Sequence, residues 1–214
     1  MSEIIYRPYQ DSDAQDVKQI INEAFYIHRY VTGSLVLDSA LELYLRERLL
    51  ASTWTRVAVK DGRVVGVIMG QVAGQPRLGG RVKNRLLIWA HMLRAGIMGL
   101  PQWRSLSQYF AFGPVYRNLR VKAREPLTDE LTLFAVASTT RGLGVGKRLY
   151  ADYLDHLRSL DRTDFYLYTD SLCSYGFYEK QGMQRASEQD MNLVLDSGQH
   201  HENLGVYLYT GTTH

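Results

Sequence analysis

The chain has 214 residues, of which 45% are hydrophobic and 22% are charged. This length fits one domain, and the composition excludes disordered, collagen-like and low-complexity proteins. No run approaches the roughly 20 apolar residues that a membrane-spanning helix needs, and no secretory signal is visible. With one cysteine, Cys173, the chain can form no internal disulfide. We therefore expect a cytoplasmic protein with no membrane span.

The first third of the chain carries both strand and helix patterns. Residues 3–9 predict a short strand, and the apolar positions of residues 17–25 have the spacing of an amphipathic helix. Ser39, followed three residues later by a glutamate, matches a capping box and predicts that a second helix begins there. Two β-branched runs joined at Asp61-Gly62 predict a β-hairpin, because this dipeptide favours the tight turn between paired strands.

Residues 75–126 differ in character from the rest of the chain. Within them, ten Lys or Arg side chains stand against one acid, whereas the whole chain has a net charge of only +3. Arg81–Met98 is predicted to be helical, and the aromatic-rich stretch after it is predicted to break at Gly113-Pro114. Because the segment is too apolar for a solvated loop, we interpret it as a helical insertion.

The last ninety residues complete the predicted fold. Glu130–Ala137 predicts a strand, residues 138–146 a tight glycine-rich loop, and Lys147–Leu160 a helix. Residues 165–170 predict another strand, which a short helix and two further strands follow. The predicted fold class is therefore α/β (α+β), a single domain over residues 1–214. Its mixed, mostly antiparallel sheet has six or seven strands flanked by helices, and the insertion lies between the third and fourth strands.

The glycine-rich loop is the central motif, and it reads Arg141-Gly142-Leu143-Gly144-Val145-Gly146-Lys147. Glycines let the backbone approach a ligand closely, and the amides that open a helix favour an anion such as a pyrophosphate. A Walker loop needs Ser or Thr after the lysine, where this chain has Arg148. A dinucleotide-binding fold has its glycines after the first strand, not late in the chain. A structural turn and a pyrophosphate site of another kind remain open.

Two segments carry a resemblance to a known family. The run Val136-x-x-x-x-Arg141-Gly142-x-Gly144-x-Gly146-x-x-Leu149 is similar to the pyrophosphate motif of the GNAT superfamily of acyl-CoA-dependent N-acetyltransferases. About thirty residues later, Phe177-Tyr178-Glu179-Lys180-Gln181-Gly182-Met183 resembles the second signature of that superfamily. In topology the resemblance covers residues 3–74 and 127–210.

The resemblance implies an acyltransferase that uses acetyl-CoA as the acyl donor and no metal. The end of the fourth strand would pair its backbone with the pantetheine arm, through Phe134, Ala135 and Val136. The pyrophosphate would be held by the glycine-rich loop, through Arg141, Gly142, Leu143, Gly144, Val145, Gly146 and Lys147. Ser171 stands where the family often has Asn, at a contact to the pantetheine or the sulfur. Tyr178 would protonate the leaving thiolate; its alternative role is core packing.

An amine substrate also requires a group that accepts its proton. Glu130 is the candidate base, because strand alternation places it on one face with Thr132, Phe134 and Val136. Some members of the family carry a glutamate base at this position. The alternative is a solvated acid at the start of a strand. Cys173 is interpreted as a packed thiol, since no His partner for a nucleophile is visible.

Several functions remain open at this stage. The favoured one is transfer of an acetyl group to a small-molecule or peptide primary amine by direct attack in a ternary complex. A non-catalytic acyl-CoA sensor or scaffold of the same fold is the alternative, and nucleic-acid binding through the insertion is not favoured. The insertion itself could form a lid over the acceptor site, a surface for lipid headgroups or nucleic acid, or a helical pair at a homodimer interface.

Overall fold

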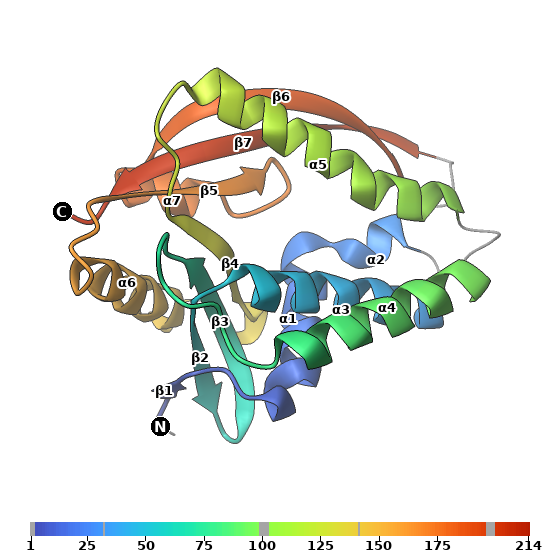
Figure 1. Cartoon of the computed structure of the whole chain (residues 1–214), viewed down its shortest axis with the longest axis horizontal. Helices are drawn as coiled ribbons and strands as arrows, with labels where there is room; N and C mark the ends of the chain where they lie inside the picture. The colour runs from blue at the N-terminus through green and yellow to red at the C-terminus, as the bar shows by residue number, and fades with distance from the viewer. Residues whose placement is uncertain (1–2, 32, 99–102, 141, 196–199) are drawn as a thin grey trace.

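The computed structural model describes residues 3–31, 33–98, 103–140, 142–195 and 200–214 (Figure 1). The strands are β1 (Ile5–Arg7), β2 (Trp54–Lys60), β3 (Arg63–Gln71), β4 (Glu130–Val136), β5 (Asp164–Asp170), β6 (Gln184–Leu195) and β7 (His200–Thr212). The helices are α1 (Ala14–Phe25), α2 (Ile27–Tyr30), α3 (Ser34–Ala51), α4 (Arg81–Met98), α5 (Trp103–Ala123), α6 (Val145–Arg158) and α7 (Gly176–Lys180). Short 3-10 turns lie at Asp11–Asp13 and Ser138–Thr140.

Within these residues, seven strands form one sheet in the order β1-β2-β3-β4-β5-β7-β6. Neighbouring strands pair antiparallel except for β4 and β5, which are parallel and share one paired position, Glu130 with Tyr166. The hairpin at Asp61-Gly62 is present, and both residues have positive φ (52° and 75°), as a tight primed turn requires. The predicted fold class is confirmed, including the two helices between the third and fourth strands.

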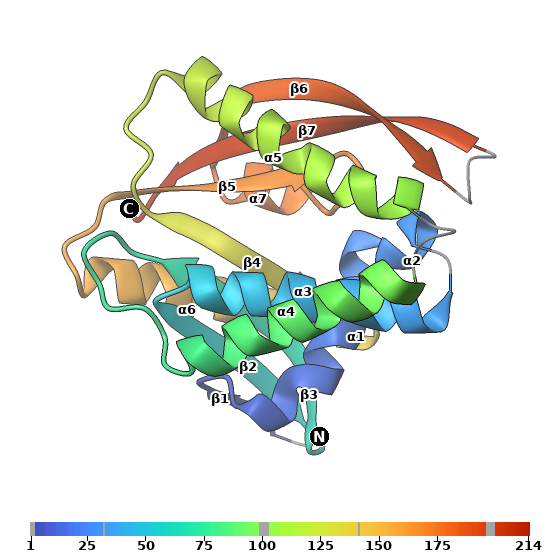
Figure 2. The same ribbon diagram turned by 45° about the vertical axis from the view of Figure 1, so that its right-hand side comes forward.

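Helices cover both faces of the sheet (Figures 1 and 2). On one face α6 buries Leu149, Tyr153 and Leu157 completely in a cluster with residues of β3 and β5. On the other face α1 and α3 cover β2, β3 and β4, and α5 covers the remaining half of the sheet. Val115 and Leu119 anchor α5 there. Helix α4 packs on α3 and forms an outer layer (Figure 2).

Two helix boundaries differ from the prediction. Ser39 does not cap α3, which begins five residues earlier at Ser34; the Ser39 hydroxyl is buried and donates to the Leu35 carbonyl one turn back. Helix α5 does not break at Gly113-Pro114 but continues through Pro114. Proline costs the helix one backbone hydrogen bond. Burial of Val115 and Leu119 against the sheet offsets that loss, which a local pattern does not reveal.

Strand β4 contains a bulge that strand alternation did not predict. Its pairing with β3 skips Thr132, whose hydroxyl donates to the Met69 carbonyl (3.0 Å). A bulge inserts one residue and inverts the alternation beyond it. Phe134 packs with the α6 cluster, whereas the Glu130 carboxylate contacts Tyr166, which packs under α5. The prediction that Glu130 shares a face with Phe134 is therefore wrong.

The approach of β3 to α6 yields a stability prediction. A Cβ atom on Gly70 would overlap the fully buried Tyr153 ring, which itself packs edge-on against Phe165. We expect Gly70→Ala to lower the free energy of unfolding by about 1–3 kcal/mol, the usual cost of overpacking a core. Gly113→Ala is the control, because a Cβ there meets nothing within 4 Å. It should change the free energy of unfolding by less than about 1 kcal/mol, because helix propensity favours Ala over Gly whereas Pro114 disfavours a Cβ on the residue before it. Equal urea midpoints for the two variants would contradict this prediction.

Candidate active site

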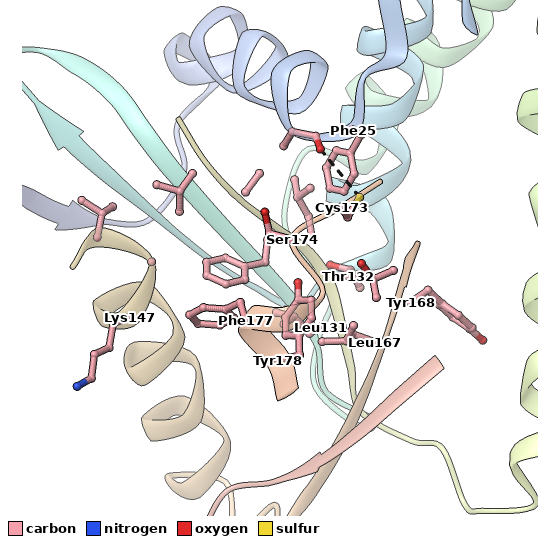
Figure 3. A pocket seen from close by; sticks show the side chains of 18 of the residues that line it. Phe25, Leu131, Thr132, Lys147, Leu167, Tyr168, Cys173, Ser174, Phe177 and Tyr178 are labelled. Atoms are coloured by element: carbon pink, nitrogen blue, oxygen red, sulfur yellow. Dashed lines mark hydrogen bonds between the residues drawn. The ribbon is translucent and has the colours of Figure 1, made fainter. Parts of the chain in front are cut away.

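A pocket of about 440 Å³ opens where β4 and β5 separate (Figure 3). Beyond the Glu130–Tyr166 pair the two strands share no further paired position in the part of the chain that the structure describes. Their carboxyl ends therefore diverge, and the pocket is walled by both strands, the glycine-rich turn, α7 and side chains from α1 and α3. Lys147 lies at one end of it and Tyr168 at the other (Figure 3).

The glycine-rich turn forms the first end of the pocket. Gly142 and Gly144 have φ of 83° and 77°, in the left-handed region that favours glycine, and a Cβ on either would meet nothing within 4 Å. Backbone therefore faces open space here, at the point where α6 begins. The first amides of a helix have no partner within it and carry partial positive charge, and the amide of Lys147 belongs to this set, whereas its side chain points away from the other lining residues (Figure 3). This end of the pocket fits a pyrophosphate.

Tyr178 lies further along the same pocket. It is carried by α7, and its ring packs between Phe177 (5.6 Å between ring centroids) and Tyr209 (6.2 Å), with Phe134 nearby (6.4 Å). Burial raises the pKa of the Tyr178 hydroxyl, and the acidic groups around it act in the same direction. The hydroxyl therefore stays protonated far above neutral pH. A protonated hydroxyl in an apolar pocket can donate a proton to a developing anion.

Cys173 also lines the pocket. Its thiol points to the Ala24 carbonyl (3.9 Å), the contact marked in Figure 3. Burial and the neighbouring Asp170 carboxylate raise the pKa of this thiol well above its ordinary value. Because the thiolate is the nucleophilic form, this environment suits a packed thiol and not a covalent catalyst.

The structure gathers most of the predicted binding residues in the pocket. Its lining includes Phe134, Ala135, Val136, Gly142, Gly144, Val145, Gly146, Lys147 and Tyr178. Leu143 is 56% exposed and does not contribute to the lining. Arg141 lies outside the described residues. Ser171 is occupied elsewhere, since its hydroxyl accepts from the Gly205 amide (3.2 Å) and its own amide donates to the Gly205 carbonyl (2.8 Å). It joins the end of β5 to β7.

Glu130 lies beside the pocket and not in its lining. Its carboxylate accepts a hydrogen bond from the Tyr166 hydroxyl (3.0 Å), which in turn accepts one from Arg120 of α5 (2.9 Å). The Arg120 guanidinium also lies over the Tyr166 ring (5.2 Å to its centroid). Tyr168, two residues further along β5, reaches the pocket directly. Helix α5 thus contacts the β5 side of the site through Arg120.

Sequence reasoning missed the far end of the pocket. We call it the aromatic end, formed by Phe25 of α1, Tyr44 of α3 and Tyr168 of β5. Phe25 and Tyr44 pack together (5.6 Å between ring centroids), and Tyr116 of α5 stacks on Tyr168 (4.3 Å). These four rings come from four elements far apart in the sequence, so no local pattern could have grouped them.

Among the described residues, no three His, Cys, Asp or Glu side chains are grouped so that they could hold a metal ion. Over the same residues, no helix combines the length and apolar character needed to cross a membrane.

Comparison with known proteins identifies the family. The family described as "Acetyltransferase (GNAT) family" matches residues 14–183, which include the glycine-rich turn and α7. The chain belongs to the GNAT family of acetyltransferases. Members of the family generally use acetyl-CoA. No curated protein matches the chain.

Solved structures share this GNAT fold over nearly the whole chain. An N-acetyltransferase from Staphylococcus aureus Mu50 aligns with a TM-score of 0.55 and 12% identity, covering 100% of both chains. The ribosomal-protein-S18-alanine N-acetyltransferase from Escherichia coli gives 0.54 and 12%, covering 99% of this chain and 94% of that one. Ard1 from Thermoplasma volcanium gives 0.53 and 17%, covering 98% and 97%. At these identities the likeness shows the fold alone.

Proposed function

We propose that the protein transfers an acetyl group from acetyl-CoA to a primary amine by direct attack in a ternary complex. One observation carries the proposal: a single pocket holds the open glycine turn at one end and the protonated Tyr178 hydroxyl further in. The turn and Lys147 would bind the pyrophosphate, and the backbone of β4 at Phe134–Val136 would pair with the pantetheine arm. The thioester would then lie near Tyr178.

The proposed reaction forms one bond and breaks another. The amine nitrogen bonds to the acetyl carbonyl carbon, the carbon–sulfur bond breaks, and the electron pair of that bond leaves on sulfur. Tyr178 donates its proton to the leaving sulfur, and the attacking nitrogen loses one N–H proton as the amide forms, which reprotonates the Tyr178 phenolate. Because burial raises the pKa of the Cys173 thiol and so favours its neutral form, the proposed route includes no acetyl-enzyme on Cys173.

The aromatic end of the pocket would receive the acceptor. Phe25, Tyr44 and Tyr168 give it an apolar wall that excludes water and can stack on a substrate. Two basic side chains of α5 turn elsewhere: Arg120 contacts Tyr166, and Lys122 contacts the Glu188 carbonyl (3.3 Å). We therefore favour an amine attached to an apolar or aromatic group over an acidic acceptor.

The proposal is tested first by binding and then by turnover. Titration calorimetry with acetyl-CoA, using ATP and NAD as controls, establishes the donor. The protein is then incubated with acetyl-CoA and a panel of aliphatic, aromatic, polyamine and peptide amines. Release of the free CoA thiol measures acetyl transfer to each amine. Turnover that favours aromatic amines supports the proposal. Acetyl-CoA binding without turnover on any amine class would favour the sensor alternative, and no acetyl-CoA binding by the folded protein would contradict both.

Glu130 is proposed to accept the amine proton, through a water that bridges it to the pocket. An ammonium must lose a proton before it attacks, whereas a weakly basic amine arrives unprotonated. Glu130→Gln should therefore lower kcat/KM about 100-fold for a strongly basic amine, within the range of general base catalysis. For a hydroxylamine-type acceptor, the loss should be only a few-fold.

Tyr166→Phe provides the matched control, because it removes the hydroxyl that contacts Glu130 but keeps the carboxylate. This variant should retain most of the activity toward both amines. A purely structural role for Glu130 would lower kcat/KM equally for the basic and the weakly basic acceptor, and that result would remove it from the mechanism.

A further inference from the structure

Helix α4 presents a row of apolar side chains to solvent. Each residue of this row is between 64% and 74% exposed: Val82, Leu86, Trp89, Leu93 and Ile97. Their spacing of three and four residues puts them on one face over about four helical turns. We call this face the α4 stripe. A surface helix ordinarily turns such a face toward the core.

Polar contacts on the opposite face and on the flanks of α4 fix its rotation. Asn84 is only 6% exposed, and its side-chain carbonyl accepts from the buried Arg46 of α3 (3.1 Å). Lys83 pairs with Asp11 (2.6 Å), and Arg94 with Asp38 of α3 (3.3 Å). If α4 turned its stripe inward, the buried Arg46 would lose one of its hydrogen-bond partners, which costs about 1–3 kcal/mol. The outward stripe is therefore a built feature of the fold.

The charges around the α4 stripe indicate what covers it. Exposed arginines accompany it, Arg81 and Arg85 on α4 and Arg77 just before the helix. From residue 75 to residue 124 the sequence contains ten Lys or Arg and no Asp or Glu. A second copy docked stripe to stripe would bring arginine against arginine without an acid from this segment to pair with them. A negatively charged surface would be attracted to the same arginines.

We propose that the α4 stripe docks on the surface of a lipid bilayer that contains anionic lipids. An interfacial helix buries an apolar face at the boundary of headgroups and acyl chains, and its basic side chains contact anionic headgroups. The stripe supplies that apolar face, and it includes Trp89, a residue type favoured at headgroup level. The helix would recognise the bilayer by its negative charge and its apolar interior together, and the helix would not cross it.

The test is flotation of the full-length protein with lipid vesicles. Vesicles of phosphatidylcholine alone are compared with vesicles that also contain phosphatidylglycerol, at low and at high salt. We expect binding to the anionic vesicles that weakens with salt, because screening reduces the attraction. Leu86→Ser/Trp89→Ser and Arg81→Gln/Arg85→Gln should each reduce the bound fraction by about tenfold.

The control variants use two valines of matched exposure. Val82→Ser removes an apolar group from the α4 stripe (74% exposed) and should weaken binding, whereas Val121→Ser (75% exposed) lies on α5 and should not. All substituted residues are exposed, so circular dichroism should show an unchanged fold. Equal binding by the two valine variants, or no binding to anionic vesicles, would overturn the proposal. The proposal would also be overturned if sedimentation showed a dimer of the wild-type protein and a monomer of Leu86→Ser/Trp89→Ser, since a second copy would then cover the α4 stripe.

Discussion

Tyr178→Phe is expected to lower the turnover number of acetyl transfer by about 100-fold while acetyl-CoA binds almost as tightly as before. The substitution removes one hydroxyl from the pocket and keeps the ring that packs between Phe177 and Tyr209. If that hydroxyl donates the proton to the leaving sulfur, its loss affects the chemical step and not the ground state. Single-turnover measurements together with calorimetry separate the two quantities.

The pH dependence of the same reaction follows from the burial of Tyr178. Its pKa lies above the ordinary value of about 10 because burial disfavours the phenolate. The donor therefore remains protonated as the pH rises through the neutral and mildly alkaline range. At every pH under about 10, ionisation of Tyr178 should therefore cause no decrease in the rate of the wild-type protein. The rate of Tyr178→Phe should be low throughout.

Tyr150→Phe is the control for this prediction. Tyr150 also packs against Phe177 (5.5 Å between ring centroids) and Phe134 (6.3 Å), and burial raises its pKa to about 12, but it does not line the pocket. Removal of its hydroxyl should leave turnover within about twofold of the wild type. If Tyr178→Phe retained full turnover on a validated acceptor, the leaving thiolate would take its proton elsewhere, and Tyr178 would be a packing residue.

The fold could be predicted because its local signals agree with one another. The Asp61-Gly62 hairpin, the amphipathic α1 and the strand–glycine turn–helix sequence from β4 to α6 each follow from short-range chemistry. Where prediction failed, a distant contact outweighed a local preference. Helix α5 continues through Pro114 because the sheet beneath it buries the neighbouring side chains. The bulge at Thr132 depends on a strand sixty residues earlier in the sequence.

The site residues also divide into those that a local motif groups and those that distant contacts bring together. The glycine-rich end of the pocket is continuous in sequence, so the glycines and Lys147 could be grouped as one motif. The aromatic end is assembled from α1, α3 and β5, with α5 behind it, and nothing in the sequence around Phe25 or Tyr44 marks either residue as part of a site. The environment of Glu130 likewise depends on the Tyr166 contact from the neighbouring strand, which period-two alternation does not describe.

Gly144→Asp should weaken acetyl-CoA binding far more than Gly144→Asn. The two substituents are nearly identical in size, and both residue types tolerate the left-handed backbone that Gly144 adopts (φ 77°). They differ by one negative charge, placed in the open space above the turn where a pyrophosphate would lie. Like charges about 5 Å apart near a protein surface repel by about 1–3 kcal/mol, a loss of roughly tenfold to a hundredfold in affinity.

Salt provides a second readout of the same interaction. Calorimetric titrations of both variants at low and high ionic strength should give dissociation constants that converge as salt rises, because screening removes only the electrostatic part of the difference. The asparagine variant shows what the backbone and the added volume cost alone. If the two variants bound acetyl-CoA equally at low salt, the glycine-rich turn would not hold the pyrophosphate. Gly142 and Gly144 would then serve only to form the turn that precedes α6.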